Sequence, residues 1–299
     1  MYDPSDPRRV LMAEQKTAFP ARPAGYGLFY RDRPVCDDDN GRTWLARGQN
    51  LVVAYSELQP GASFERADQI DEFVVLLPYP ETPVVANARG QVEHSDGYAL
   101  IIMPPGPSRL VFPRGGRVVR LFSTRSADLV AKCSNADDYR EPDPNIPPFE
   151  PWPDPVGGYR IRVHSLDVPP QEGRAGKIFR CTTMMVNASG VRLGPRDSTK
   201  LSPHAHDDFE QYSLALSGTW THHMRWPWTT DLSEWREDVH AVVESPSLTV
   251  IPPRVIHTSV YGDGENQLVD IFAPPRKDFS RRPGWVLNAD DYPMPMESA

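Results

Sequence analysis

Apolar and polar residues alternate over many short stretches of this chain, and Gly or Pro ends most of them. Typical examples are residues 118–122 (VVRLF), 212–217 (YSLALS) and 267–272 (QLVDIF). Alternation with a period of two is typical of half-buried β-strands. Helical periodicity is scarce, and we expect only short helical pieces near residues 7–15 and 229–238. With 33 prolines and 20 glycines, which penalise long helices, the chain is predicted to be all-β.

A proline-rich segment divides the chain into two halves of similar length. Residues 141–156 read EPDPNIPPFEPWPDPV and contain seven prolines. Prolines remove backbone donors and stiffen a segment into an extended connector. The 299 residues are enough for two domains of typical size. We therefore expect an N-terminal domain at 1–145 and a C-terminal domain at 146–299.

The two halves share three sequence matches that occur in the same order. IIMPPGPSRL at 101–110 matches TVIPPRVIHT at 249–258 with a shift of 148 residues. IDEFVVLLP at 70–78 matches FEQYSLALS at 209–217 with a shift of 139. A weaker match pairs RLFSTR with DIFAPP near the end of each half. This order predicts one all-β unit used twice, and short strands joined by closing turns favour barrels or sandwiches.

Composition and charge exclude two classes of partner. The chain has 40 acidic and 32 basic residues, a net charge of −8, and no run of Lys or Arg that would follow a nucleic-acid backbone. No apolar stretch approaches the roughly 20 residues that cross a bilayer, so no membrane partner is expected. The first 16 residues lack the apolar centre of a signal peptide. We therefore expect a cytoplasmic protein that binds a small molecule.

Two histidines and a glutamate stand immediately before an apolar run, in the stretch HAHDDFEQYSLALSG. Residues two apart in a strand share a face, so His204, His206 and Glu210 would point to the same side. His257, which follows a Pro-Pro corner, would supply a fourth ligand from another strand. Imidazole and carboxylate together suit a divalent transition metal, and Fe, Mn, Co, Ni, Cu and Zn all remain open. Gln211 is a rival ligand, but it has the opposite parity and we favour the glutamate.

These residues resemble the two motifs of the cupin superfamily. The first motif is His-x-His, three or four residues, Glu, and a Gly after about six more. Here seven residues separate Glu210 from Gly218, one more than usual. The stretch PPRVIH is similar to the second motif, Pro-x-Gly-x-x-His, with Arg254 at the glycine position. This change could alter the turn before His257, but it leaves the histidine at the right distance. The resemblance covers residues 160–275 well and 45–125 weakly.

The resemblance implies a bicupin, which consists of two tandem jelly-roll barrels. It also implies one metal, with Fe favoured, in the second barrel, held by His204, His206, Glu210 and His257. The same alignment places Glu65, Ala67, Asp71 and Arg109 at these positions in the first half. This second set has no imidazole, and a guanidinium stays protonated and cannot bind a metal. We expect a metal-free first barrel kept for packing or dimerisation, in which Arg109 pairs with Glu65 or Asp71. Bicupins often associate, so a homo-oligomer, most simply a dimer, is expected.

The strand after the first motif is rich in Trp, His and Arg, and one of its faces should line the cavity. Either Trp220, His222 and Met224 or Thr221, His223 and Arg225 would point inward. The candidate catalytic residues are Tyr212, His222 and Arg225. Arg225 could anchor a substrate carboxylate through paired hydrogen bonds. Tyr212 shares the parity of Glu210 and could serve as an acid or base, although a strand Tyr is often simply packed.

Two reactions fit a metal with open positions for a chelating substrate. In the first, a redox metal takes an enol, catechol or keto-acid substrate together with O₂, and a carbon–carbon bond is cleaved. In the second, the metal polarises a carbonyl as a Lewis acid while a base moves a proton on a sugar or organic acid. The Trp-rich strand suggests an apolar pocket, so we favour a dioxygenase over an isomerase, lyase or hydrolase. A non-catalytic protein that binds a small ligand is a third hypothesis.

Overall fold

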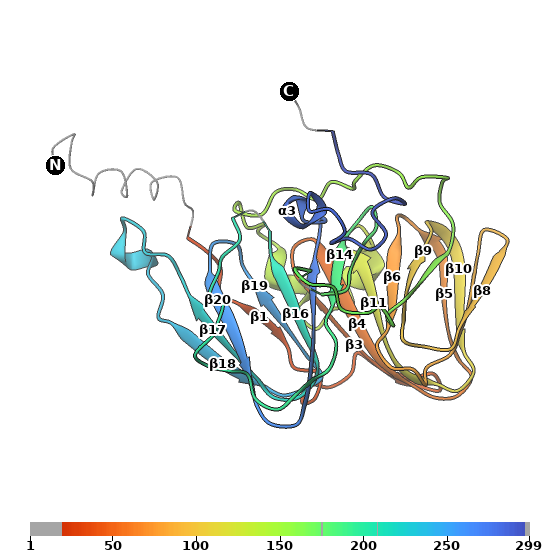
Figure 1. The fold of residues 1–299 in the computed structure, drawn as a ribbon, viewed down its shortest axis with the longest axis horizontal. Coiled ribbons are helices and arrows are strands. Elements are labelled where there is room, and N and C mark those ends of the chain that lie inside the picture. The colour runs from red at the N-terminus through yellow and green to blue at the C-terminus, as the bar shows by residue number, and fades with distance from the viewer. Residues whose placement is uncertain (1–19, 175, 208, 297–299) are drawn as a thin grey trace.

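The computed structural model describes residues 20–174, 176–207 and 209–296 (Figure 1). This part of the chain consists almost entirely of strands and loops, as the alternation predicts. Its helices are α2 (Ala127–Val130), η1 (Ala136–Tyr139), η2 (Leu232–Glu234) and α3 (Lys277–Ser280). Of the two predicted helical segments, 229–238 contains η2, and 7–15 lies outside the described residues. Within the described part, no helix has the length and apolarity needed to cross a membrane.

The first barrel is built from two sheets that face each other. The larger sheet has the order β12 (Arg162–Ser165), β9 (Ala99–Met103), β6 (Phe73–Leu77), β11 (Gly116–Ser123), β4 (Leu51–Leu58), β3 (Gly41–Arg47) and β2 (Cys36–Asp38). The smaller sheet has the order β5 (Ala62–Gln69), β10 (Gly106–Phe112), β7 (Val84–Ala88) and β8 (Gln91–Ser95). All pairings in both sheets are antiparallel.

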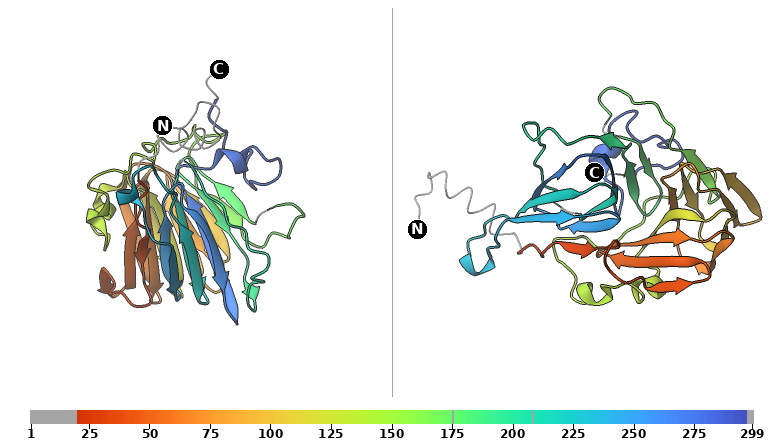
Figure 2. Two further views of the ribbon diagram at one scale, coloured as in Figure 1. Left: turned by 90° about the vertical axis from the view of Figure 1, so that its left-hand side faces the viewer. Right: turned by 90° about the horizontal axis from the view of Figure 1, so that it is seen from below.

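The second barrel repeats this design. Its larger sheet has the order β1 (Gly25–Gly27), β19 (Ser247–Ile251), β16 (Gln211–Ser217), β21 (Glu265–Phe272), β14 (Met185–Ala188) and β13 (Ile178–Arg180), and β15 (Arg192–Leu193) also pairs with β21. Its smaller sheet has the order β18 (Val239–Val243), β17 (Trp220–Arg225) and β20 (Ile256–Tyr261). The two barrels lie side by side, in red to yellow and in cyan to blue (Figure 1 and Figure 2).

The sheet order confirms the internal repeat and corrects its register by one residue. The run β9–β6–β11–β4–β3 corresponds to β19–β16–β21–β14–β13. Phe73 pairs with Met103, and Gln211 pairs with Ile251, which is 148 residues after Met103. Phe73 and Gln211 are therefore equivalent, with a shift of 138 rather than 139. The equivalent of Glu210 is consequently Glu72, and not Asp71 as the sequence alignment suggested.

Each half lends one strand to the other barrel. Strand β1 pairs with β19 of the second barrel, with Gly25 opposite Val250. Strand β12, which follows the proline-rich connector, pairs with β9 of the first barrel, with Arg162 opposite Ile102. Ile102 and Val250 are equivalent positions, so the exchange is reciprocal. The division at residue 145 stays a prediction, and these two strands do not follow it.

A shared core joins the two larger sheets. Strands β6 and β16 are buried on both faces, and in β6 this burial matches the continuous apolar sequence FVVLL. On one face, Val74 and Tyr212 belong to the same core cluster, which spans both barrels. On the other face of β6, Phe73 and Val75 fill the interior of the first barrel. The barrels therefore form one packed body whose contact surface is a stack of two sheets.

Candidate metal centre

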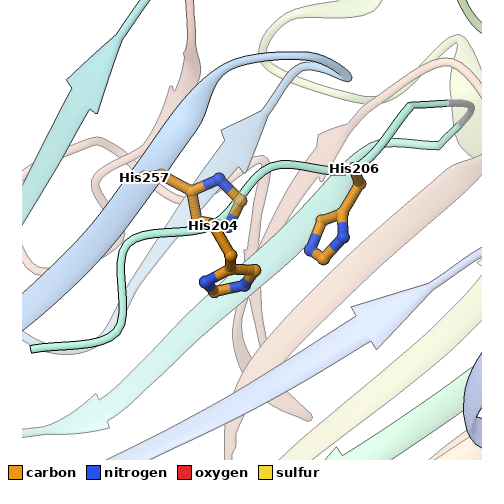
Figure 3. A group of neighbouring side chains, drawn as sticks. All are labelled: His204, His206 and His257. Atoms are coloured by element: carbon orange, nitrogen blue, oxygen red, sulfur yellow. The ribbon is translucent and has the colours of Figure 1, made fainter.

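Three histidines gather at one end of the second barrel (Figure 3). His204 and His257 form an isolated antiparallel bridge, in which each backbone N–H donates to the other residue's carbonyl, at 3.1 and 2.8 Å. His206 lies two residues further along the chain, and its ring centroid is 4.9 Å from that of His204 and 5.3 Å from that of His257. One nitrogen of each ring lies within 4.8 Å of the others. This is the arrangement predicted for the three histidines.

The hydrogen bonds and burial of these rings leave lone pairs available for a cation. Nδ1 of His204 is 2.8 Å from the carbonyl oxygen of Ser202, and Nδ1 of His257 is 2.9 Å from that of Val255. A carbonyl oxygen can only accept, so in these two rings Nδ1 carries the proton and Nε2 carries a lone pair. In His206 the roles are reversed, because its Nε2 lies 2.9 Å from Oε1 of Gln211, an amide oxygen that also only accepts, and the lone pair is on Nδ1. Burial lowers the pKa of His206 to about 3 and the pKa of His257 to about 4. Both rings are therefore neutral at pH 7, as metal ligands must be.

Arg254, at the glycine position of the second motif, keeps the turn that a glycine would make. Its φ is +67°, in the left-handed region where a side chain costs about 1–2 kcal/mol. Its backbone N–H donates to the carbonyl oxygen of His206 at 2.5 Å. This bond ties the turn before His257 to the other motif. Arg254 thus adopts the left-handed conformation that glycine favours, and His257 sits beside His204.

Gln211, and not Glu210, faces the three histidines. Oε1 of Gln211 is 2.9 Å from Nε2 of His206 and 3.2 Å from Nε2 of His257. The parity argument for Glu210 was wrong because β16 begins only at Gln211, so the two-residue period does not extend back to His206. A spacing signal was present in the sequence. Counted from Gln211, six residues precede Gly218, which is the usual spacing of the first motif.

Glu210 instead lies between the two barrels. Its carboxylate accepts hydrogen bonds from the backbone N–H of Gln49 at 2.8 Å, from the Tyr139 hydroxyl at 2.5 Å and from the Tyr212 hydroxyl at 2.6 Å. Burial raises the pKa of Glu210. A Cβ at Gly48 would lie 2.3 Å from the Tyr212 hydroxyl, so only glycine allows this close approach. Glu210 and Tyr212 therefore contribute to the interface between the barrels, and neither is brought to the histidines.

Strand β17 turns one of the two predicted sets of side chains inward. Trp220, His222 and Met224 are buried, whereas Arg225 is exposed. Nδ1 of His222 lies 2.8 Å from the Ser259 hydroxyl on β20. Arg225 makes a bidentate ion pair with Asp238 on the outer face, so it cannot anchor a substrate in the barrel. Of the three candidate catalytic residues, the structure brings only His222 into the barrel of the histidines.

A buried carboxylate orients Gln211. Nε2 of Gln211 donates to the Ser213 hydroxyl at 3.0 Å and to Oδ1 of Asp270 at 3.1 Å. The Ser213 hydroxyl also donates to Asp270, at 2.8 Å. Burial raises the pKa of Asp270. These bonds direct Oε1 of Gln211 toward the histidines, as outer carboxylates commonly do for metal ligands. Three imidazole nitrogens and one amide oxygen thus form a donor set that fits a divalent transition metal.

The histidines separate two cavities. The inner cavity, of about 190 Å³, is lined by His204, Gln211 and His257 together with Arg192, Arg196 and Ser259. The outer cleft, of about 1080 Å³, is lined by His204, His206, Trp152 and Arg276 among others. The three arginines were missed by the sequence reasoning, because no motif or periodicity marks them. They become neighbours of the histidines only when distant loops fold over the barrel.

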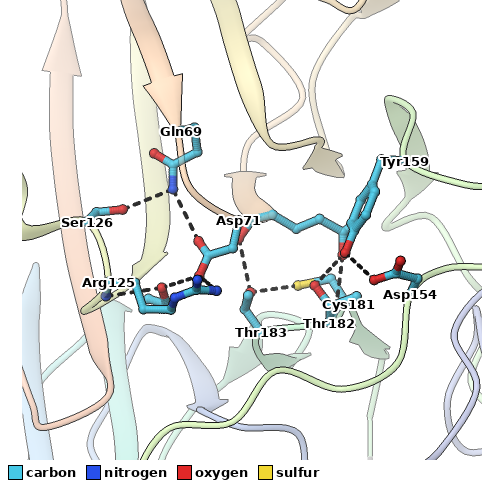
Figure 4. Close-up of polar contacts among 11 residues, drawn as sticks. Gln69, Asp71, Arg125, Ser126, Asp154, Tyr159, Cys181, Thr182 and Thr183 are labelled. Carbon is cyan, nitrogen blue, oxygen red and sulfur yellow. Dashed lines mark hydrogen bonds and ion pairs between the residues drawn. The ribbon is translucent and has the colours of Figure 1, made fainter.

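The first barrel has no comparable cluster among the described residues. Arg109 pairs with Glu65 at 3.2 Å, which confirms one of the two predicted ion pairs. Their side chains are 57% and 68% exposed, so the pair lies at the surface and does not fill a buried site. Asp71 instead contacts Gln69 at 3.3 Å and Arg125 at 3.6 Å (Figure 4).

Solved structures with a similar fold include proteins of several kinds. Oxalate decarboxylase from Lactobacillus farciminis, in a formate complex, has a TM-score of 0.53 at 14% identity, covering 84% of this chain and 86% of that chain. AerE from Microcystis aeruginosa has a TM-score of 0.51 at 10% identity, covering 77% and 91%. The 7S globulin of Momordica charantia has a TM-score of 0.50 at 12% identity, covering 83% of each chain. No family model and no curated protein matches the sequence.

At identities this low, the comparisons establish the fold and leave the activity open. The matched length covers both barrels, because 77–84% of this chain is included in these three comparisons. The chain therefore has the bicupin fold, with two jelly-roll barrels in tandem.

Proposed function

We propose that this protein is a mononuclear metal enzyme that cleaves a small enol, catechol or keto-acid substrate with O₂. The observation that carries the proposal is the cluster of His204, His206 and His257, whose ring nitrogens lie within 4.8 Å of one another, with Oε1 of Gln211 beside two of them. A metal held by these residues would offer open positions that two adjacent oxygens of the substrate could chelate, and would supply the chemistry for its reaction with O₂. Both atoms of O₂ would enter the products, so no external reductant is required. Fe is the favoured metal.

The charge of the donor set determines which substrates it favours. Imidazole and amide are neutral ligands when they bind a metal, and Asp270, the carboxylate bonded to Gln211, is already occupied by Ser213 and Gln211. A divalent ion would therefore keep its full positive charge, which favours an anionic chelator such as an enolate, a catecholate or a carboxylate. Replacement of the usual glutamate by Gln211 is the reason for this preference.

The arginines around the site would bind the rest of an anionic substrate. In the inner cavity, Arg196 is held by donation to the Ser259 carbonyl at 2.5 Å and to the Ser202 hydroxyl at 3.0 Å. Because these bonds preorganise its guanidinium, less entropy is lost when it pairs with a carboxylate. In the outer cleft, Arg276 packs 3.7 Å from the Phe279 ring centroid and pairs with Asp278. Substrate would enter on the side of Arg276 and reach the histidines.

His222 would act through Ser259. The Ser259 hydroxyl lines the inner cavity, and Nδ1 of His222 lies 2.8 Å from it. Burial lowers the pKa of His222 to about 4, so the ring is neutral and can accept a proton from that hydroxyl or return one. His222 thereby fixes the direction of the hydroxyl beside the substrate.

Oxygen uptake by Fe-loaded protein tests the proposal. We expect stoichiometric O₂ consumption with at least one 1,3-diketone, catechol or α-keto acid, and carbon–carbon cleavage products by mass spectrometry. The His257→Ala variant should consume none. If Fe-loaded protein binds these compounds tightly and consumes no O₂, the protein is a ligand-binding cupin and the proposal fails.

A second candidate, Lewis-acid chemistry on an organic acid, is favoured by the polar interior of the barrel. Trp220 is the one tryptophan among the described residues that line the inner cavity, so the expected Trp-rich pocket does not form there. Ser247 Oγ, Thr249 Oγ1 and His222 Nε2 are buried without a partner in the described structure. Such groups suit a polar substrate or water. Anaerobic protein loaded with Mn or Zn should then decarboxylate an organic acid or exchange its α-hydrogen with solvent deuterium, whereas an oxygenase would do neither.

A further inference from the structure

The interior of the first barrel contains a buried arginine. Arg120 lies on β11, where Val118 and Phe122 point into the first-barrel core and Leu121 points into the shared core. The alternation of a strand places Arg120 on the inner face with Val118 and Phe122. It is 8% exposed, so its guanidinium is removed from solvent almost completely.

Nothing in the described structure neutralises this charge. No described carboxylate lies within ion-pair distance of Arg120, and its Nε is buried without a hydrogen-bond partner. Its one close polar contact is from Nη2 to the Ser56 hydroxyl, at 3.5 Å. Arg66, the other guanidinium nearby, is already paired with Asp128 and Gln69. Burial, followed by the charge of Arg66, lowers the pKa of Arg120 to about 9, so it remains protonated at pH 7.

An aromatic ring compensates for part of this burial. The guanidinium carbon of Arg120 lies 3.3 Å from the centroid of Phe64 on the facing sheet. Such a cation–π contact attracts the charge through the face of the guanidinium. The ring of Phe64 cannot accept hydrogen bonds from the N–H groups, because these point outward in the guanidinium plane. The guanidinium of Arg120 therefore still lacks a negatively charged hydrogen-bond acceptor in its own plane.

The second barrel shows the opposite arrangement at the same position. Arg120 pairs with Val75 on β6, and Asp270 pairs with Ser213 on β16. Val75 and Ser213 are equivalent in the corrected register, so Arg120 replaces Asp270. In the second barrel, a buried carboxylate supports the donors for a cation. In the first barrel, the buried group at this place is a cation that lacks an anion.

Two hydroxyls extend the polar surface beside Arg120. Ser56 Oγ and Thr43 Oγ1 are 2.9 Å apart, and both side chains are buried on the inner face of neighbouring strands. Each hydroxyl can rotate to donate to a neighbouring oxygen. The residues directly opposite Arg120 on the adjacent strands, Ala54 and Val75, are apolar and compact. The surroundings thus offer hydrogen-bond donors on one side and apolar packing on the other, which suits a small anion.

We propose that the first barrel binds a small planar oxyanion, such as a carboxylate or nitrate, between Arg120 and the hydroxyls of Ser56 and Thr43. The planar fork of a guanidinium matches two oxygens of such an anion with paired hydrogen bonds. The bound anion supplies the acceptor that Nε lacks and neutralises the buried charge. The first barrel is then an anion site, and this role does not depend on the metal centre or on the reaction proposed for it.

Titration calorimetry and thermal unfolding of the full chain test this site. Formate and nitrate are titrated at constant ionic strength, balanced with sodium chloride. We expect saturable binding at one site per chain and a melting temperature that rises with anion concentration, because a ligand that binds only the folded state stabilises it. In Arg120→Gln, affinity should fall by about tenfold or more, and the rise in melting temperature should disappear. Arg114→Gln, which removes an exposed arginine just before β11, should behave as the wild type.

Further variants separate this site from others. If Arg120→Gln does not fold, Ser56→Ala replaces it and should weaken binding by a few-fold, as expected for one lost hydrogen bond. Undiminished binding in both variants would overturn the proposal. The same holds if His257→Ala abolishes formate binding while Arg120→Gln retains it, since the anion would then lie at the histidines. Inorganic phosphate should bind more weakly than formate. Tighter binding of phosphate that depends on Arg120 would refute the proposal that the site prefers planar oxyanions.

Discussion

Glu72 and Glu210 occupy equivalent positions in the two barrels, and each carboxylate is bonded to the other half of the chain. Glu72 accepts hydrogen bonds from the backbone N–H and hydroxyl of Thr182, at 3.0 and 2.8 Å, and from the Tyr292 hydroxyl at 2.9 Å. Glu210 accepts from Gln49 and Tyr139. The two glutamates therefore clamp the barrels together reciprocally. Tyr292 belongs to the C-terminal segment, so this hydrogen bond also ties that segment to the first barrel.

Removal of the Glu72 carboxylate should destabilise the fold. In Glu72→Ala, the Thr182 N–H and the Tyr292 hydroxyl would lose their acceptor in a buried place, at a cost of about 1–3 kcal/mol each. We expect the free energy of unfolding in urea to fall by about 3 kcal/mol. Glu65→Ala is the matched control, because its carboxylate lies at the surface of the same barrel and exposed ion pairs contribute little. Equal effects of the two substitutions would contradict the clamp.

Gln211 and Glu210 should differ in their effect on metal binding. Gln211→Ala removes the amide oxygen beside the histidines, and we expect metal affinity to fall by about tenfold or more. Gln211→Glu should raise the affinity, because it adds an anionic donor. Glu210→Gln should leave the metal content unchanged and lower the melting temperature. Elemental analysis of the three purified variants provides the measurement. Loss of metal from Glu210→Gln alone would mean that Glu210, as the sequence suggested, is the fourth ligand.

Metal binding should persist well below pH 6.5. The pKa values of His206 and His257 are lowered from 6.5 to about 3 and about 4, so their nitrogens stay unprotonated as the pH falls. At these two rings, protons therefore begin to compete with the metal only as the pH approaches about 4. We expect full metal content after dialysis at pH 5.5 and loss near pH 4. A loss with its midpoint near pH 6.5 would mean that the rings are not buried in solution.

Tyr212 should matter for stability and not for turnover. Tyr212→Phe removes a hydrogen bond to the buried carboxylate of Glu210, and we expect the free energy of unfolding to fall by about 1.5–3 kcal/mol. Tyr139→Phe, which removes another hydrogen bond to Glu210, should have a similar effect. Neither should change kcat by more than about twofold, because the hydroxyls do not touch the reacting groups. A large fall in kcat with unchanged stability would mean that Tyr212 takes part in catalysis.

Substitution of Arg196 and substitution of Arg225 should have different effects on substrate binding. Arg196 lines the inner cavity, so Arg196→Ala should raise KM for an anionic substrate by about tenfold, the loss of one charge-assisted contact. Arg225, which pairs with Asp238 on the outer face, is the matched control. Arg225→Ala should leave KM and kcat unchanged. The reverse order of effects would mean that substrate approaches from the outer face of β17.

The fold class, the internal repeat and the grouping of the three histidines could all be predicted from the residues alone. Alternation and turn residues are local properties, and the equal order of the matches in the two halves needs no coordinates. The sequence also excluded the first barrel as a histidine site, since no imidazole stands at the matching positions. The association into a dimer stays a prediction from the cupin resemblance.

Which side chain lies beside the three histidines could be read only from the folded chain. The two-residue period holds only within a strand, and Glu210 lies one residue before β16 begins. Parity therefore gave the wrong residue, and the side chain beside the histidines is that of Gln211. The cavity arginines and the unpaired Arg120 come from segments far apart in sequence, and their proximity depends on sheet closure. The charge of Arg120 is costly because the side chain is buried. That burial results from the packing of the whole barrel, so no local sequence pattern predicts it.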